Sequence, residues 1–245
     1  MLSITTADGV AEAIVSTPPA GHGPGVLFFM DAFGLRPRIQ DMADEIAGWG
    51  YVVLAPNVFY RDGTVAELAP HDDLSTPTGR EAFWRVAGPR IERLTPSRVV
   101  SDNDAYLAAL GSVAGVAPAP VGVVGFCMGT RLAIRAAGRH PDVVVACAGF
   151  HGGGLVDETA DSPHRELASA RAEFLFGHAD NDRSMTAEDS AALDAALVGA
   201  HLTALNETYQ GAPHGYTMAD TSAWNEAAFV RAFANLRELL ARTLH

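Results

Sequence analysis

Apolar residues recur along the chain in six short runs, separated by longer stretches of mixed polarity. The runs are GVLFFMD (25–31), YVVLAP (51–56), PVGVVGF (120–126), VVVACAGF (143–150), AEFLFG (172–177) and LTALNETY (202–209). Each run is rich in β-branched or aromatic residues and has the length of a strand. Nearly continuous apolar runs are typical of strands covered on both faces, so the pattern predicts a mostly parallel sheet.

Helical stretches fill the intervals between these runs. They cover 37–50, 101–115, 127–140 and 186–200, and a long segment at 221–243 closes the chain. The alternation of strand and helix predicts an α/β fold with helices on both faces of the sheet. An Asp8-Gly9 turn between two short alternating runs adds an N-terminal β-hairpin. In such sheets ligands bind beyond the carboxyl ends of the strands.

The organisation of the chain indicates one domain that spans residues 1–245. Its 245 residues, 48% of them hydrophobic, suffice for one large core, and no repeat or low-complexity linker divides them. The span from about 60 to 96 is rich in Pro, Asp and Arg and shows the least regular pattern. We expect an irregular excursion there that lines a pocket at the sheet edge.

Charge and cysteine content exclude several kinds of partner. The net charge is -12, and all 17 basic residues are arginines with no basic stripe, which argues against nucleic acid and anionic membranes as partners. No apolar run approaches the roughly 20 residues of a membrane span, and we expect a cytoplasmic protein, as monomer or homodimer. The two cysteines suggest neither disulfide nor zinc site, so we expect no metal and no cofactor.

One cysteine lies where an α/β sheet would place a nucleophile. Gly125-Phe126-Cys127-Met128-Gly129 follows a strand-like run and precedes a helix. A nucleophile elbow needs small residues two before and two after the reactive side chain, because its tight turn leaves no room for others. The alternative is a buried cysteine that acts as a small hydrophobe. Cys147, which lacks such flanks, is predicted to be packing alone.

A nucleophile of this kind needs a histidine and an acid. In this architecture both come after the nucleophile in the sequence, first the acid and then the histidine. His214 lies in a Gly/Pro loop after the last strand-like run, although a loop histidine can also serve turn contacts only. Asp180 follows the run that ends at Gly177, and it is the predicted acid because it comes first after that run. Asp182 is the competing candidate, and Asp189 is interpreted as a solvated helix residue.

With these pieces in order, the sequence resembles the dienelactone hydrolase family of α/β hydrolases, also called carboxymethylenebutenolidases. The resemblance covers nearly the whole chain and is sharpest at MDAFG, LAPNVFYR, GFCMG, GHAD and PHGY. It implies Cys127, Asp180 and His214 as the catalytic triad. It further implies that the backbone N–H groups of Ala32 and Met128 form the oxyanion hole.

The same resemblance assigns a thiol-activating role to an acidic residue after the first parallel strand. The family has a glutamate there, whereas this chain has the shorter Asp31, which could act through a water or only shape the site. A carboxylate that caps a turn or helix is the simpler alternative.

Substrate recognition departs from the family pattern. The family enzyme that opens dienelactone holds a carboxylate with two arginines, and Met218 replaces one of them here. Arg80 is a candidate for the other, although Arg85 is close in sequence and either could be a surface residue. Trp84 and Tyr60 could form an apolar pocket wall or belong to the core.

We therefore expect a hydrolase for a small neutral ester or lactone. The alternatives are a thioesterase with the same triad and a non-catalytic ligand-binding homologue.

Overall fold

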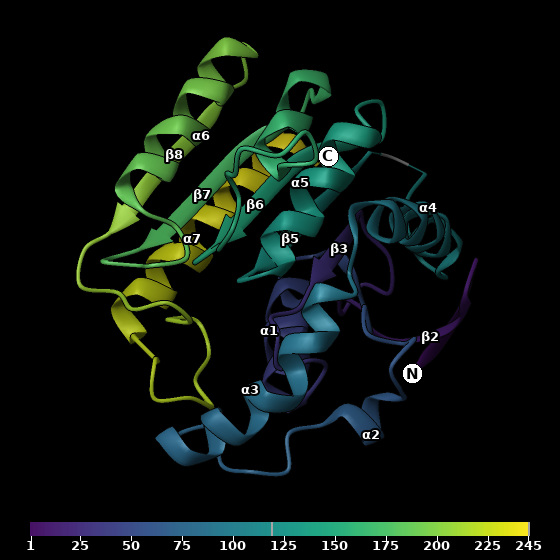
Figure 1. The fold of residues 1–245 in the computed structure, drawn as a ribbon. Helices are drawn as coiled ribbons and strands as arrows, with labels where there is room; N and C mark the ends of the chain where they lie inside the picture. The colour runs from purple at the N-terminus through teal and green to yellow at the C-terminus, as the bar shows by residue number, and fades with distance from the viewer. Residues whose placement is uncertain (119, 245) are drawn as a thin grey trace.

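The structure is a computed structural model that describes residues 1–118 and 120–244 (Figure 1). An eight-stranded sheet has the order β1-β2-β4-β3-β5-β6-β7-β8. β1 and β2 form an antiparallel hairpin, β2 pairs antiparallel with β4, and all other pairings are parallel. The predicted α/β-hydrolase fold with an N-terminal hairpin is thereby confirmed. The strands are β1 Leu2–Thr6, β2 Gly9–Ser16, β3 Gly25–Phe29, β4 Val52–Pro56, β5 Val121–Phe126, β6 Val144–Phe150, β7 Glu173–Ala179 and β8 Ala204–Tyr209.

Helices cover both faces of this sheet. The helices are α1 Pro37–Gly48, α2 Val65–Leu68, α3 Pro77–Glu92, α4 Pro96–Ser112, α5 Gly129–Arg139, the 3-10 helix η1 Pro163–Ser169, α6 Ala187–Gly199 and α7 Glu226–Thr243. α1 and α7 share one face, where the Trp49 and Phe233 rings meet, and α4 and α5 pack together on the other (Figure 1). β3, β4 and β5 are fully buried between them, which explains their unbroken apolar sequences.

The span from 60 to 96 is more regular than the sequence predicts. It contains α2 and α3, and α4 begins at Pro96 rather than at 101. Thr64 caps α2 in a capping box, and the Thr76 side chain caps α3. Pro77 and Pro96 stand in the first turn of their helices, where proline lacks only an N–H that would be unpaired anyway. Two of the prolines that suggested an irregular segment therefore start helices, whereas Pro89 lies inside α3.

The strand order places a crevice suited to ligand binding at the carboxyl ends of the strands. From β3 the chain goes first to β4 on one side and later to β5 on the other. The loops that leave the carboxyl ends of β3 and β5 therefore diverge and open a crevice between them. Asp31 follows β3 and Cys127 follows β5, so both lie at this crevice.

Candidate active site

Cys127 occupies a strained turn between β5 and α5. Its φ of 54° lies in the left-handed region, and its backbone N–H donates to the Phe150 carbonyl at 3.0 Å. A Cβ on Gly125 would come within 2.3 Å of the Gly129 carbonyl oxygen, and one on Gly129 within 2.5 Å of the Phe29 carbonyl oxygen. Both glycines are thus required by close backbone approach, as the elbow prediction supposes. The thiol is partly accessible rather than sealed in the core.

Cys147, in contrast, is completely buried in β6. Burial in the apolar interior raises the pKa of its thiol, because the thiolate would lose its hydration there. This is the packing residue that the sequence predicts.

The loop after β8 brings a histidine to the thiol. His214 Nε2 lies 3.0 Å from Cys127 Sγ, although 87 residues separate the two in sequence. Gly211 and Gly215, on either side of the histidine, have φ values of 73° and 90°, which glycine adopts without strain. The ring is therefore presented by a tight loop that these two glycines permit.

The carboxylate that bonds this histidine belongs to Asp182, so the prediction of Asp180 is wrong. Asp182 Oδ2 lies 2.5 Å from His214 Nδ1, and its other oxygen accepts from Ser184 Oγ at 2.7 Å. Asp180 instead accepts the Gly211 N–H at 2.9 Å and ties the β7 and β8 loops together. β7 continues to Ala179, beyond the predicted end at Gly177. Asp180 is therefore the first turn residue, and Asn181 follows it with a φ of 53°, in the left-handed region.

The electrostatics of this arrangement favour a protonated imidazole. Burial lowers the pKa of His214, but the hydrogen bonds with Asp182 and Cys127 outweigh burial and raise it to about 10. Burial raises the pKa of Asp182, whereas its bonds with His214 and Ser184 lower it more, and the net shift is downward. The carboxylate is thus ionised and faces a ring that holds its proton at neutral pH.

Two backbone N–H groups lie at the same crevice. Ala32 and Met128 are buried residues directly after Asp31 and Cys127. Among residues 1–118 and 120–244, no acceptor is bonded to either N–H. Met128 also precedes the first residue of α5, where the helix dipole is positive. The arrangement is suited to an oxyanion, and no side chain at either position is needed for it.

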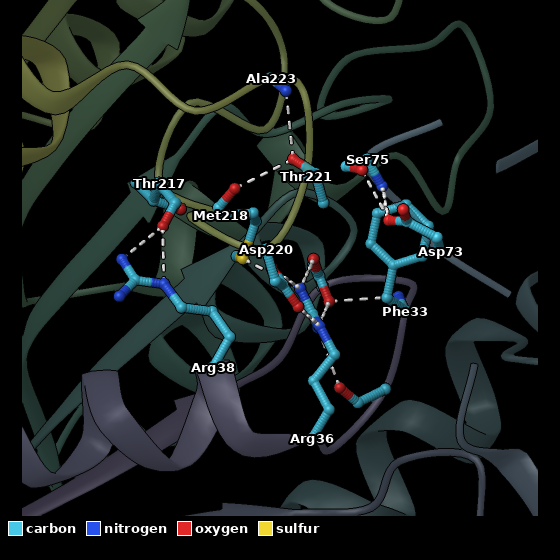
Figure 2. Close-up of polar contacts among 12 residues, drawn as sticks. Phe33, Arg36, Arg38, Asp73, Ser75, Thr217, Met218, Asp220, Thr221 and Ala223 are labelled. Carbon is cyan, nitrogen blue, oxygen red and sulfur yellow. Dashed lines mark hydrogen bonds and ion pairs between the residues drawn. The ribbon is translucent and has the colours of Figure 1, made fainter. Parts of the chain in front are cut away.

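Asp31 lines the same pocket as Cys127, but the hydrogen bonds of its carboxylate go to Arg36 and Phe33 and not to the thiol. Both of its oxygens bind Arg36, at 2.6 Å to Nη1 and 3.0 Å to Nη2, and Oδ1 also accepts the Phe33 N–H at 3.1 Å. Asp220 binds the same guanidinium from the other side (Figure 2). Burial raises the pKa of Asp31, and the ion pair with Arg36 opposes that shift. Both oxygens of the carboxylate are thus engaged in an ion pair with Arg36, which the sequence analysis did not predict.

A pocket of about 150 Å³ opens over the thiol. Arg80 and Trp84, both on α3, line it and so stand where the sequence predicts substrate contacts. Tyr60 is not among its lining residues, because its hydroxyl donates to Asp102 at 2.9 Å. The lining consists of Asp31, Ala32, Phe33, Arg80, Trp84, Cys127, His151, His214, Gly215, Met218, Thr221 and Ala223.

A second histidine in this pocket was not anticipated. His151 directly follows β6, is fully buried, and packs its ring edge-to-face on His214 with 5.3 Å between centroids. Its Nε2 lies 2.7 Å from Thr217 Oγ1. Burial, and next the charge of His214, lower the pKa of His151 well below the usual range, so this ring is neutral. Its position after a strand run was the one available signal, because carboxyl ends of strands hold the ligand site.

A cysteine elbow at the switch point of an eight-stranded, mainly parallel sheet is the architecture of an α/β hydrolase. More narrowly, the chain belongs to the dienelactone hydrolase family, whose model matches residues 11–244. The protein is accordingly a hydrolase. Among the described residues, no helix has the length and apolar character to cross a membrane.

Individual relatives agree with this assignment. A Synechocystis protein assigned as a carboxymethylenebutenolidase is 26% identical over 240 residues, which is 96% of this chain and 92% of the relative. A carboxymethylenebutenolidase of a Pseudomonas species is 25% identical over 238 residues, 94% of this chain and 89% of that enzyme. A Klebsiella pneumoniae protein assigned to the dienelactone hydrolases shares the fold, with a TM-score of 0.82, 21% identity and coverage of 98% and 96%.

Proposed function

We propose that the protein hydrolyses a small, uncharged ester or lactone through a covalent acyl-thioester on Cys127. The observation that carries this proposal is the hydrogen-bonded chain from Cys127 Sγ through His214 to Asp182, set beside the N–H groups of Ala32 and Met128. The nucleophile and the base thus line one small pocket, and the orienting acid bonds the base from behind it. The family includes carboxymethylenebutenolidases, which agrees with a lactone or ester as the substrate class.

In the first half-reaction, Sγ attacks the carbonyl carbon and forms a C–S bond. His214 Nε2 is in hydrogen-bond contact with the sulfur, and the proposed attacking form is a thiolate paired with the imidazolium. The carbonyl oxygen becomes an oxyanion that accepts from the Ala32 and Met128 N–H groups, each worth about 3 kcal/mol in the transition state. The C–O bond then breaks, and the leaving oxygen takes the proton from His214 Nε2.

In the second half-reaction, the now neutral His214 removes a proton from water. The hydroxide forms the new C–O bond at the thioester carbon, the C–S bond breaks, and the acid leaves while the thiolate and imidazolium are restored. Asp182 fixes the ring tautomer and stabilises its positive charge throughout. General acid–base work of this kind contributes on the order of 10²–10⁴-fold in rate.

The surroundings of the thiol favour an uncharged substrate. Met218 lines the pocket where the resemblance places a carboxylate-binding arginine in the dienelactone-opening enzyme. Arg36 lies behind Met218, but two aspartates already bind its guanidinium. Among the described residues, Arg80 is the one arginine that lines the pocket, so a two-arginine clamp is incomplete.

The decisive test compares the two cysteines in a screen of esters, lactones and thioesters that differ in charge. We expect Cys127→Ala to lose p-nitrophenyl ester turnover by at least about 10³-fold, because the covalent route is removed. Cys147→Ala, the matched control, should retain turnover because that thiol is sealed in β6. Equal activity of Cys127→Ala and wild type would refute the proposal, and a preference for anionic substrates would contradict the uncharged substrate class.

A further inference from the structure

One end of the active-site pocket is closed by a two-layer wall. Met218 and Asp31 form its inner layer and line the pocket. The Arg36 guanidinium forms the outer layer, with Nη2 3.3 Å from Met218 Sδ and with Asp220 bound to it (Figure 2). Asp31 binds the same guanidinium. Asp220 comes from the loop between β8 and α7, 184 residues away from Arg36 in sequence. The wall therefore joins the segment between β3 and α1 to the segment between β8 and α7.

The guanidinium in this wall has no donor left for a substrate. Nε donates to Asp220 at 2.5 Å, and Nη1 donates to Asp31 and to the Gly34 carbonyl at 2.6 and 3.1 Å. Nη2 donates to Asp31 at 3.0 Å and to Asp220 at 3.2 Å. All five N–H groups are thus satisfied. Burial lowers the pKa of Arg36, but the two carboxylates outweigh burial and raise it, so the cation is permanent.

A larger groove lies immediately beyond the wall. Its volume is about 570 Å³, and Arg36 and Asp220 form its inner end. Apolar side chains from the α1 entry and the 65–74 segment, among them Leu35, Val65 and Leu74, make up most of the rest. The wall of Met218, Asp31, Arg36 and Asp220 therefore separates a pocket of about 150 Å³ from a groove nearly four times its size.

We infer that the Met218–Arg36–Asp220 wall limits substrate length, so that the group bound against it is short and uncharged. This inference rests on the proposed esterase function and names the substrate class within it. The closed pocket is smaller than the roughly 300–1,000 Å³ of pockets for drug-sized ligands. A saturated guanidinium with two carboxylates offers neither room for a long chain nor a donor for an anion.

The test uses two substrate series, because the wall limits whichever end of the ester lies against it. One series lengthens the acyl chain of p-nitrophenyl esters from acetate to octanoate, and the other lengthens the alkyl group of acetate esters. In wild type we expect kcat/KM to fall at least tenfold between the four-carbon and eight-carbon members of at least one series. Met218→Ala with Asp220→Ala should raise the eight-to-four-carbon ratio in that series at least tenfold.

Asp220 is the acid to remove because its side chain is 34% exposed and its loss leaves the buried Arg36–Asp31 pair intact. Met218→Ala alone keeps all ion pairs and should shift the ratio less, in the same direction, which covers the case in which the double variant fails to fold. Asp72→Ala removes a carboxylate from the same groove but not from the wall, and should leave the ratio unchanged.

Two results would overturn the inference. The first is a folded variant, verified by thermal unfolding, with the wild-type ratio in both series while hydrolysis still depends on Cys127. That result leaves the proposed function standing and removes the wall as a length limit. The second is the absence of Cys127-dependent hydrolysis in either series, which would refute both the function and the inference built on it.

Discussion

At the scale of single residues, the arrangement of the site depends on which side chains bond one another. Cys127, His214 and Asp182 form one hydrogen-bonded chain, and a single residue separates the bonded acid from its near neighbour Asp180. An aspartate on the imidazole matters because it fixes the tautomer and stabilises the positive charge. The two aspartates therefore have different roles that can be tested separately.

We predict that Asp182→Asn lowers kcat/KM for p-nitrophenyl esters by on the order of 10³-fold or more, since an amide can leave His214 in the wrong tautomer. Asp180→Asn is the matched control and should keep most of the activity, because its side-chain oxygen still accepts the Gly211 N–H. The measurement is steady-state kinetics on both variants. Loss of activity in Asp180→Asn alone would reverse the assignment of the acid.

The raised pKa of His214 also predicts a pH dependence of stability. The pKa of the imidazole rises from its ordinary value of 6.5 to about 10 in the folded protein. Because the folded state binds this proton more tightly than the unfolded state, the stabilisation is complete below about pH 6.5 and is lost as the pH rises through about 10. We expect the Tm difference between wild type and His214→Gln to shrink from pH 6.5 to pH 10 in thermal unfolding. A difference that stays constant or grows would contradict the prediction.

At the scale of elements, the strand-to-helix turn from β5 to α5 positions the nucleophile and the Met128 N–H together. The turn fits because α5 begins against the end of β3, where the Phe29 and Met30 carbonyl oxygens leave no space for a Cβ on Gly129. The Gly-x-Cys-x-Gly pattern in the sequence indicates this lack of space for side chains. In contrast, α3 was missed, because its apolar residues do not form a strong stripe and Pro89 lies inside it.

We predict that Gly129→Ala destabilises the protein by about 1–3 kcal/mol and impairs ester turnover, because a Cβ there meets backbone at 2.5 Å and 2.6 Å. Gly111→Ala is the matched control within α4, where an added Cβ meets no described atom within 4 Å. It should stabilise the helix by roughly 0.5–1 kcal/mol, since alanine is the better helix former. Urea unfolding of both variants measures the difference, and similar curves would show that the elbow tolerates a side chain.

At the scale of the whole molecule, the topology of the sheet collects the site. The loops after β3, β5, β6, β7 and β8 supply Ala32, Cys127, His151, Asp182 and His214, and these loops meet because parallel strands end at one edge. α3 covers this edge with Arg80 and Trp84, so the predicted excursion does line the pocket, although it is helical. The β1–β2 hairpin lies at one side of the sheet, and β7 and β8 lie at the opposite side.

The sequence by itself determined where the parallel strands lie along the chain, the α/β architecture, the elbow at Cys127 and the loop histidine His214. These features are encoded in local periodicity and in short motifs, which persist whatever the rest of the chain does. Tertiary structure alone decided that Asp182 rather than Asp180 bonds the histidine, that Arg36 captures Asp31, and that Asp220 completes the pair from 184 residues away. Such choices depend on distances of a few ångströms between loops, and hydrogen bonds and ion pairs are lost when those distances change by about 1 Å.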